Sequence, residues 1–98
     1  MILEHAILPV QVGRGEDFER AFTAATHIIS SMPGFIGLTL SRCVERPDAY
    51  LLLVQWRTLA DHVEGFRKSE PYQEWRNLLH HLYDPFPVVE HFEQVHSA

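Results

Sequence analysis

The segment Tyr50-Leu-Leu-Leu-Val-Gln-Trp56 constrains the fold of this chain more than any other. A short run of large apolar side chains is typical of a strand that is covered on both of its faces. Such a strand lies in the centre of its sheet. The run therefore predicts a central strand that is covered on both of its faces.

Strand and helix patterns alternate before this segment. Residues 2–10 and 35–44 have strand character, and the turn sequence Glu45-Arg46-Pro47-Asp48 predicts that 35–44 and the central strand form a hairpin. Between the first two strands, apolar residues from Phe18 to Met32 recur at the spacing of one helix face. The sequence Met32-Pro33-Gly34 is expected to end that helix.

The last third of the chain predicts more helix and one further strand. Thr58, with Asp61 three residues later, is typical of a helix start, and this short helix continues to Phe66. Ser69 opens another helix whose apolar stripe reaches Leu82, and residues 88–95 form the last strand. The order β-α-β-β-α-β predicts an α+β, ferredoxin-like fold with a four-stranded antiparallel sheet that carries its helices on one face.

Composition and charge exclude several classes of protein. Apolar residues make up 46% and charged residues 21% of the chain, so we expect a single folded domain over residues 1–98 rather than a disordered chain or a coiled coil. A net charge of −5 has the wrong sign for a nucleic-acid-binding protein. With no membrane-spanning stretch, no signal-peptide pattern and Cys43 as its single cysteine, the protein is expected to be cytoplasmic.

The sheet face opposite the helices is expected to be apolar as well. Six large side chains alternate out of register with those that face the helices: Leu3, Ile7, Phe35, Leu51, Leu53 and Val89. An exposed apolar patch on a small protein usually marks an interface. Two sheets that stack face to face around a two-fold axis would bury it, so we expect a homodimer.

Four segments of the chain have a characteristic order and spacing. They are Met32-Pro33-Gly34-Phe35, Gln55-Trp56-Arg57, Asp61-His62-x3-Phe66-x2-Ser69-x2-Tyr72 and Pro87-Val88-Val89-Glu90-His91-Phe92. Together they resemble the antibiotic biosynthesis monooxygenase superfamily, whose members are dimeric α+β barrels. The resemblance covers almost the whole chain and implies the fold. It does not by itself imply one activity, because a fold can host many functions.

One branch of that superfamily oxidises phenolic substrates to quinones with dioxygen and without a metal or flavin. In such proteins an apolar cavity orients the substrate and a side chain accepts a proton. The resemblance places Trp56, His62 and Tyr72 at the pocket-side positions of this branch and so implies that they are catalytic. Trp56 would be a flat wall for an aromatic ligand, His62 a proton acceptor and Tyr72 a hydrogen-bond donor.

Each of these residues also has a structural interpretation. Trp56 lies on the helix-facing side of its strand and is of the type found in cores. Tyr72 fits a core position with its hydroxyl at the edge of the core. His62 fits an exposed or capping position on a helix surface. Sequence alone does not separate these interpretations from the catalytic ones.

A second branch of the superfamily degrades haem. Its members use an asparagine on the first strand, a tryptophan near the end of the third and an iron-ligating histidine on the last helix. By spacing, Trp56 matches the tryptophan, but the asparagine position falls on Ala6 and the histidine position near Trp75 or Arg76. Because two of the three elements depart from the pattern, we expect no haem and no other cofactor.

The seven histidines do not have the spacing of a metal site. His80 and His81 are adjacent and point about 100° apart on a helix, so they do not converge on one ion. His5, His91 and His96 lie on strands that the fold places together, but no cysteine or carboxylate cluster completes a site. We therefore expect no bound metal.

The expected function is that of a cofactor-independent monooxygenase acting on a small aromatic or quinol-type compound. The alternative is a non-catalytic module that binds a small apolar ligand in the same pocket. Both functions need an apolar cavity between the sheet and the helices, so composition and spacing do not distinguish them.

Overall fold

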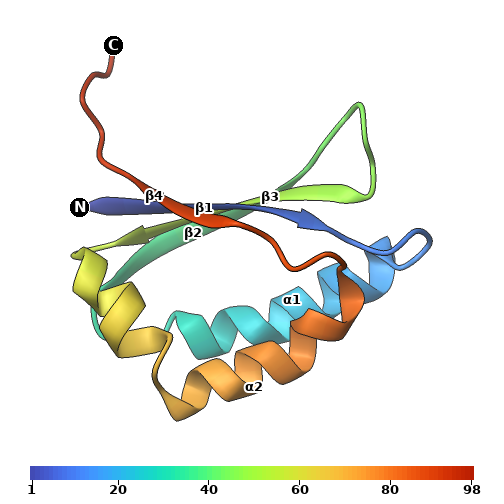
Figure 1. Ribbon diagram of the computed structural model, residues 1–98, viewed down its shortest axis with the longest axis horizontal. Coiled ribbons are helices and arrows are strands. Elements are labelled where there is room, and N and C mark those ends of the chain that lie inside the picture. Colours follow the sequence, from blue (N-terminus) through green and yellow to red (C-terminus); the bar gives the residue numbers. More distant parts are fainter.

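A computed structural model describes all 98 residues and confirms the βαββαβ order (Figure 1). The strands are β1 (Ile2–Pro9), β2 (Phe35–Arg42), β3 (Ala49–Trp56) and β4 (Val89–Phe92). The helices are α1 (Gly15–Ile29) and α2 (Glu70–Leu79), with a π-helical turn η1 (Asp61–Phe66) and a 3-10 turn η2 (His80–Leu82). All neighbouring strands are antiparallel, in the order β2-β3-β1-β4, so β3 is a central strand as its apolar run predicts.

The core lies between the sheet and the two helices, which pack against each other on one face of the sheet (Figure 1). Alternate residues of β3 enter this core, as the sequence predicts: Tyr50, Leu52, Val54 and Trp56. The helices contribute fully buried side chains such as Phe18, Ile29 and Leu79. None of the helices has the length and hydropathy that a membrane span requires.

The opposite face of the sheet is apolar at its centre. Paired residues in neighbouring strands point to the same side, and the pairs Ile7–Leu51 and His5–Leu53 place four of the expected side chains there: Leu3, Ile7, Leu51 and Leu53. Phe92 joins them from β4, where it pairs with Leu3. Ile7 and Phe92 remain 39% and 47% exposed, so this outer face is an open apolar surface in a single chain.

Phe35 and Val89, however, face the helices, and their assignment to the outer face was wrong. Phe35 pairs with Trp56, and a β-bulge at Ile36 then shifts the register, so the alternation of β2 changes face there. Val89 pairs with Ala6, which is buried in the core. Both side chains pack against the core cluster.

Four elements end earlier than their sequence patterns predict. The last strand stops at Phe92 rather than at residue 95, because it pairs only with residues Leu3–Ala6 of β1. The first helix stops at Ile29 instead of Met32, and β2 stops at Arg42 instead of residue 44. The helix that was expected to reach Leu82 tightens into η2 after Leu79.

The corner at Gly34 fixes the start of η1. Gly34 has a φ of 84°, and a Cβ atom at this position would overlap the Asp61 side chain, so only glycine fits without strain. Asp61 also forms the expected capping box: its N–H donates to Thr58 Oγ1 at 3.2 Å, and the Thr58 N–H donates to Asp61 Oδ2 at 3.2 Å. These contacts position the turn that carries His62.

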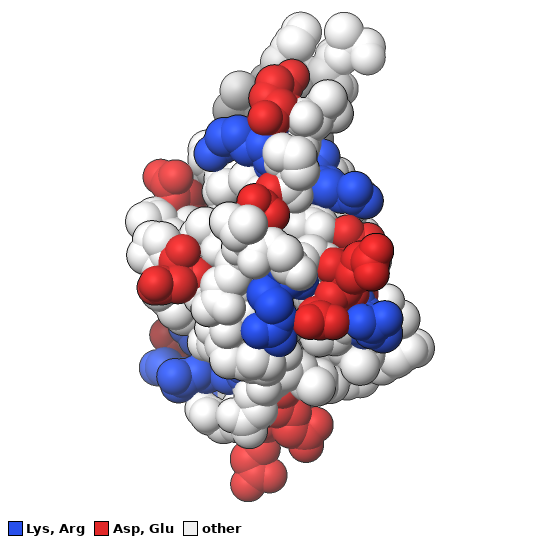
Figure 2. All heavy atoms as spheres, turned by 90° about the vertical axis from the view of Figure 1, so that its right-hand side faces the viewer, with Lys and Arg blue, Asp and Glu red and all other residues white.

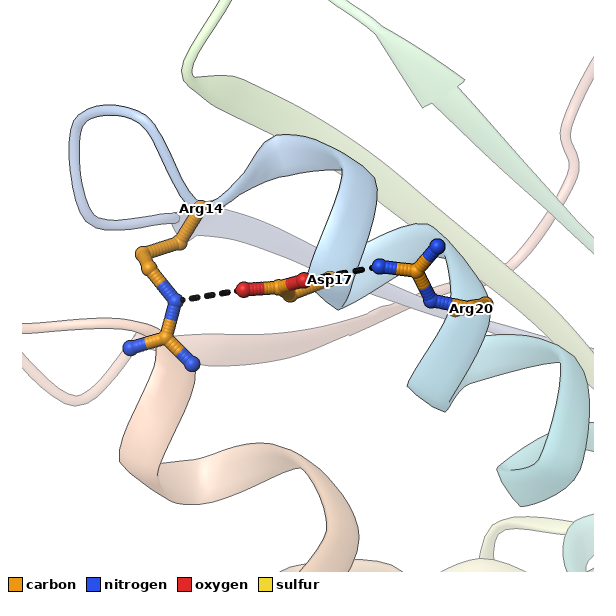
Figure 3. Close-up of polar contacts among 3 residues, drawn as sticks. All are labelled: Arg14, Asp17 and Arg20. Atoms are coloured by element: carbon orange, nitrogen blue, oxygen red, sulfur yellow. Dashed lines mark hydrogen bonds and ion pairs between the residues drawn. The ribbon is translucent and has the colours of Figure 1, made fainter.

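The start of α1 is organised by an exposed ion-pair cluster (Figure 3). Asp17, in the first turn, accepts hydrogen bonds from Arg14 Nε at 2.9 Å and from Arg20 at 2.8 Å. These bonds hold the pKa of Asp17 below its usual range. The carboxylate therefore stays charged at the helix N-terminus, where it complements the helix dipole.

Charged side chains are mixed rather than segregated on the face seen in Figure 2. Acidic and basic groups lie next to one another there, and the basic groups do not form a continuous patch. Proteins that bind nucleic acid usually present a basic stripe or patch. This face lacks such a surface.

Candidate functional site

A cavity with a mainly apolar lining lies between the sheet and α2. Its volume is about 330 Å³, and most of its lining is hydrophobic. The walls come from β1, β3, η1, α2 and the segment after α2, and include Leu8, Leu52, Phe66, Trp75, Leu79 and Val89. The cavity therefore has the size and composition typical of a small-molecule site.

Glu4 brings a carboxyl group into this apolar wall. It occupies an inward-facing position of β1, lines the cavity and is only 6% exposed. The indole N–H of Trp56 donates a hydrogen bond to Glu4 Oε1 at 2.9 Å. A buried carboxyl group needs such a donor, because leaving it without a partner costs free energy.

His62 lies next to Glu4 and is 3% exposed, so the interpretation as an exposed histidine on a helix surface was wrong. Its Nε2 is 3.3 Å from Glu4 Oε1, and its Nδ1 is 2.8 Å from Nε2 of His91. The imidazole also stacks on Trp56, with ring centroids 5.3 Å apart and an interplanar angle of 18°. The η1 turn thus places His62 against the helix-facing side of the sheet, over the paired strands β1 and β4.

Burial sets the protonation of these groups. Desolvation lowers the pKa of His62 to about 3, and the charges of Arg67 and His91 act in the same direction. Desolvation and Arg67 also lower the pKa of His91. Both imidazoles are therefore neutral at neutral pH. For Glu4, desolvation raises the pKa, against the opposing effects of the Trp56 hydrogen bond and the Arg67 charge.

Of the three residues proposed from sequence, His62 and Tyr72 line the cavity. Tyr72 is partly buried, and its ring packs edge-on against Phe66 at 5.3 Å. Trp56 does not line the cavity, because it is fully buried behind His62, so it does not form the expected wall for a ligand. Its place is in the core, where it supports Glu4 and His62.

Two residues that line the site, Glu4 and Arg67, were missed in the sequence, and His91 was considered only as a metal ligand. A lone carboxylate on an apolar strand is normally expected to face solvent, and the chain separation between Glu4 and Trp56 hides their contact. Arg67 lines the cavity and makes no ion pair with any side chain. Nothing in the local pattern identified these residues.

The histidines do not assemble into a metal centre. No group of three His, Cys, Asp or Glu side chains is arranged to hold an ion. His5 and His91 lie on opposite faces of the sheet, since His5 pairs with Glu90 and His91 pairs with Glu4. The Glu4, His62 and His91 side chains form a chain through different atoms of His62 rather than converging on one point.

Comparisons by sequence identify two informative relatives. The chain is 54% identical over 95 residues to the uncharacterised protein YczJ of Bacillus subtilis, covering 97% of this chain and all of that protein. It is 27% identical over 70 residues to a mycobilin-producing haem oxygenase of Mycobacterium tuberculosis, covering 71% of this chain and 57% of the enzyme.

Comparisons with solved structures identify proteins that share the fold of this chain. A putative antibiotic biosynthesis monooxygenase from Bordetella bronchiseptica is 37% identical, with a TM-score of 0.92 and 96% of each chain covered. SnoaB, a cofactor-independent oxygenase from Streptomyces nogalater, is 17% identical and shares the fold, with a TM-score of 0.85 over 98% of this chain and 94% of that one. The family model for antibiotic biosynthesis monooxygenases matches residues 1–78. This chain therefore belongs to the antibiotic biosynthesis monooxygenase family.

Proposed function

We propose that this protein is a cofactor-independent monooxygenase that oxidises a small aromatic or quinol-type compound with dioxygen. The observation that carries the proposal is the apolar cavity that encloses two neighbouring proton-carrying groups, Glu4 and His62. Apolar walls exclude water, and removing a proton from a phenol raises its electron density. An electron-rich phenolate transfers an electron to dioxygen more easily than the phenol does. The fold shared with SnoaB supports the same reaction class.

The reaction needs no added reductant. A quinol and one dioxygen molecule give a hydroxyquinone and one water molecule. One oxygen atom is bonded to the ring, and the other leaves as water with two hydrogens from the substrate. The substrate supplies all the electrons that reduce dioxygen, so the protein has to bind, orient and exchange protons.

The cavity volume limits the substrate. A protein cavity of about 150 Å³ holds benzene. A space of about 330 Å³ therefore suits a compound with one or two fused rings. Tyr72 and Arg67 line the same space and can bind oxygen atoms on such rings. We expect naphthohydroquinone-sized compounds to fit better than tetracyclic ones.

Oxygen uptake tests this function. Purified protein is mixed with hydroquinone, 1,4-naphthohydroquinone and a tetracyclic phenol, and oxygen consumption is compared with that of each compound alone. The proposal expects uptake above autoxidation with a one- or two-ring quinol, with one dioxygen consumed per hydroxyquinone formed. A ligand that raises the melting temperature without any oxygen consumption would instead indicate the binding module.

The residues at the position expected to ligate haem iron do not fit that role. Trp75, at the expected ligand position, is packed between the rings of Phe22 and Phe66, and Arg76 does not line the cavity. His80 does line it. The space of about 330 Å³ is at the small end of the range for ligand pockets.

Titration with haem is accordingly expected to give no saturable Soret shift. The measurement is an absorption spectrum at increasing haem concentration, with the His80→Ala variant as the control for the one free cavity histidine. A one-to-one complex in the unmodified protein that degrades its haem when a reductant is added would contradict the proposal and favour the activity of the mycobacterial relative.

We also propose that the protein is a homodimer through the outer face of the sheet. Five large apolar side chains lie on this face: Leu3, Ile7, Leu51, Leu53 and Phe92. His5, on the same face, has a buried Nδ1 without a hydrogen-bond partner in a single chain. Stacking of two copies would cover these apolar side chains. A specific interface buries about 800 Å² per partner.

Light scattering is expected to give twice the 11.4 kDa mass of the chain at micromolar concentration. The Leu53→Arg variant should shift the protein towards monomer, because a charge buried without a partner opposes association. Val12→Arg, at a turn residue that is 87% exposed, is the matched control and should leave the mass unchanged. A monomeric unmodified protein over the whole dilution series would contradict the dimer.

A further inference from the structure

The two oxygen atoms of the Glu4 carboxyl group have different surroundings. Both contacts of this group, with Trp56 Nε1 and with His62 Nε2, are made by Oε1. Oε2 makes no hydrogen bond, and it is not among the atoms enclosed without a partner. Glu4 lines the cavity, and Oε2 is its carboxyl oxygen without a partner in the protein, so it is the oxygen left to contact a ligand there.

Both ring nitrogens of His62 are engaged within the protein. Nε2 faces Glu4 and Nδ1 faces His91, so neither nitrogen is free to meet a ligand. His91 lies on the edge strand β4, is partly exposed and does not line the cavity. The three side chains thus run from the cavity, through the sheet-facing side of η1, to the edge of the sheet.

We propose that Glu4, His62 and His91 form a proton path from the cavity to solvent, in which Glu4 rather than His62 meets the hydroxyl group of the bound phenol. The proposal rests on the proposed function, since a phenolic substrate supplies the proton. It assigns Glu4 as the group that contacts the substrate, and His62 and His91 as the residues that carry its proton away.

The proton moves by one relay in which each group gains one proton and loses one. The phenol O–H passes its proton to Glu4 Oε2 while the proton on Oε1 passes to Nε2 of His62. The proton on His62 Nδ1 passes to Nε2 of His91, and His91 Nδ1 releases its proton to water. A phenolate stays in the cavity, and one proton enters the solvent. The 3.3 Å contact between Glu4 Oε1 and His62 Nε2 does not have hydrogen-bond geometry in the free protein, but catalytic contacts are often long or poorly aligned without a ligand and tighten when it binds.

Burial favours the protonation states of Glu4, His62 and His91 from which this proton relay starts. Burial favours the neutral acid form of Glu4 and the neutral form of both imidazoles. Trp56 can donate to Oε1 whether or not that oxygen carries a proton. The phenolate would lie in the cavity that the Arg67 guanidinium also lines. Arg67 has no ion-pair partner within the protein, so its charge is available to the phenolate.

The first test needs no substrate. Protein labelled with ¹⁵N-histidine is examined by two-bond ¹H–¹⁵N correlation at pH 7, which distinguishes the protonated nitrogen of each ring. The proposal expects His62 to be neutral with its proton on Nδ1, and expects that proton to move to Nε2 in Glu4→Gln, whose amide oxygen can only accept. A wild-type His62 that is charged, or that carries its proton on Nε2, would overturn the path.

The second test uses the quinol identified by oxygen uptake. His91→Ala is expected to lower turnover about 10-fold or more, and imidazole added to the solution should restore part of the loss. His81→Ala, which removes an exposed histidine outside the path, is the control and should keep full turnover. Full turnover in His91→Ala, or a loss that imidazole does not reverse, would contradict a proton-carrying role.

The two proposals fail in different ways. If no quinol is oxidised, the proposed function is wrong, and the NMR measurement still decides whether the three groups have the hydrogen-bond order of the path. If quinols are oxidised at the same rate with Glu4→Gln as with the unmodified protein, the oxygenase stands and the path is wrong.

Discussion

Replacement of His62 by alanine is expected to lower the turnover of a quinol by about 10²–10⁴-fold, the usual contribution of a general acid or base. The imidazole is the link between Glu4, which lines the cavity, and His91, at the edge of the sheet. Alanine leaves Glu4 without this neighbour and removes the exit for the proton. The measurement is oxygen uptake at saturating quinol, with the melting temperature determined in parallel.

Two controls make the His62 result interpretable. The His81→Ala variant removes an exposed imidazole and should change neither turnover nor stability, because surface substitutions usually stay within about 0.5 kcal/mol. The His62→Gln variant keeps a polar side chain of similar size but cannot accept and release a proton at neutral pH, so it should fold and remain slow. Unmodified turnover in a folded His62→Ala variant would remove His62 from the mechanism.

Replacement of Trp56 by alanine is expected to reduce the free energy of unfolding by about 3–5 kcal/mol, as for other buried tryptophans. The side chain is 0% exposed and contacts the rings of Phe35, His62 and Phe66. Its loss leaves a large cavity and deprives Glu4 of its N–H donor. Urea denaturation at one fixed protein concentration measures the change, since the stability of a dimer depends on concentration.

A more conservative variant separates the packing of Trp56 from its hydrogen bond to Glu4. Trp56→Phe keeps most of the packing and removes the hydrogen bond to Glu4, so it should cost less than alanine. The matched control is Phe86→Ala, which removes an aromatic side chain that is 62% exposed and should change stability little. A Trp56→Ala variant as stable as this control would show that the indole does not support the core.

The main features of the fold could be predicted because they depend on local periodicity. The alternation of β3 identifies Trp56 as a helix-facing residue from the sequence alone, and the structure confirms it. Phe35 shows the limit of that reasoning. Its side chain points to the core because a bulge at Ile36 reverses the alternation of β2, and only pairing with β3 reveals the extra residue.

The site depends much more on contacts between distant parts of the chain. Glu4 is buried because Trp56, 52 positions later, supplies its hydrogen bond. His91 reaches His62 because β4 pairs with β1 in the register that sets His91 beside Glu4. No local pattern contains these relations, so the sequence indicated His62 and Tyr72 through a resemblance and did not indicate the groups that surround them.

Because η1 is a π-helical turn, the direction in which His62 points depends on the length of the segment between Thr58 and Ser69. In η1 the N–H of Arg67 bonds to the carbonyl of His62, five residues back, so the turn holds one residue more than an α-helical turn. Deleting one residue would restore α-helical spacing and rotate the flanking side chains by about 100°. A descendant with such a deletion could keep the sheet and both helices while His62 turned away from Glu4. Segment length, more than overall identity, should therefore separate relatives that keep this arrangement from those that have lost it.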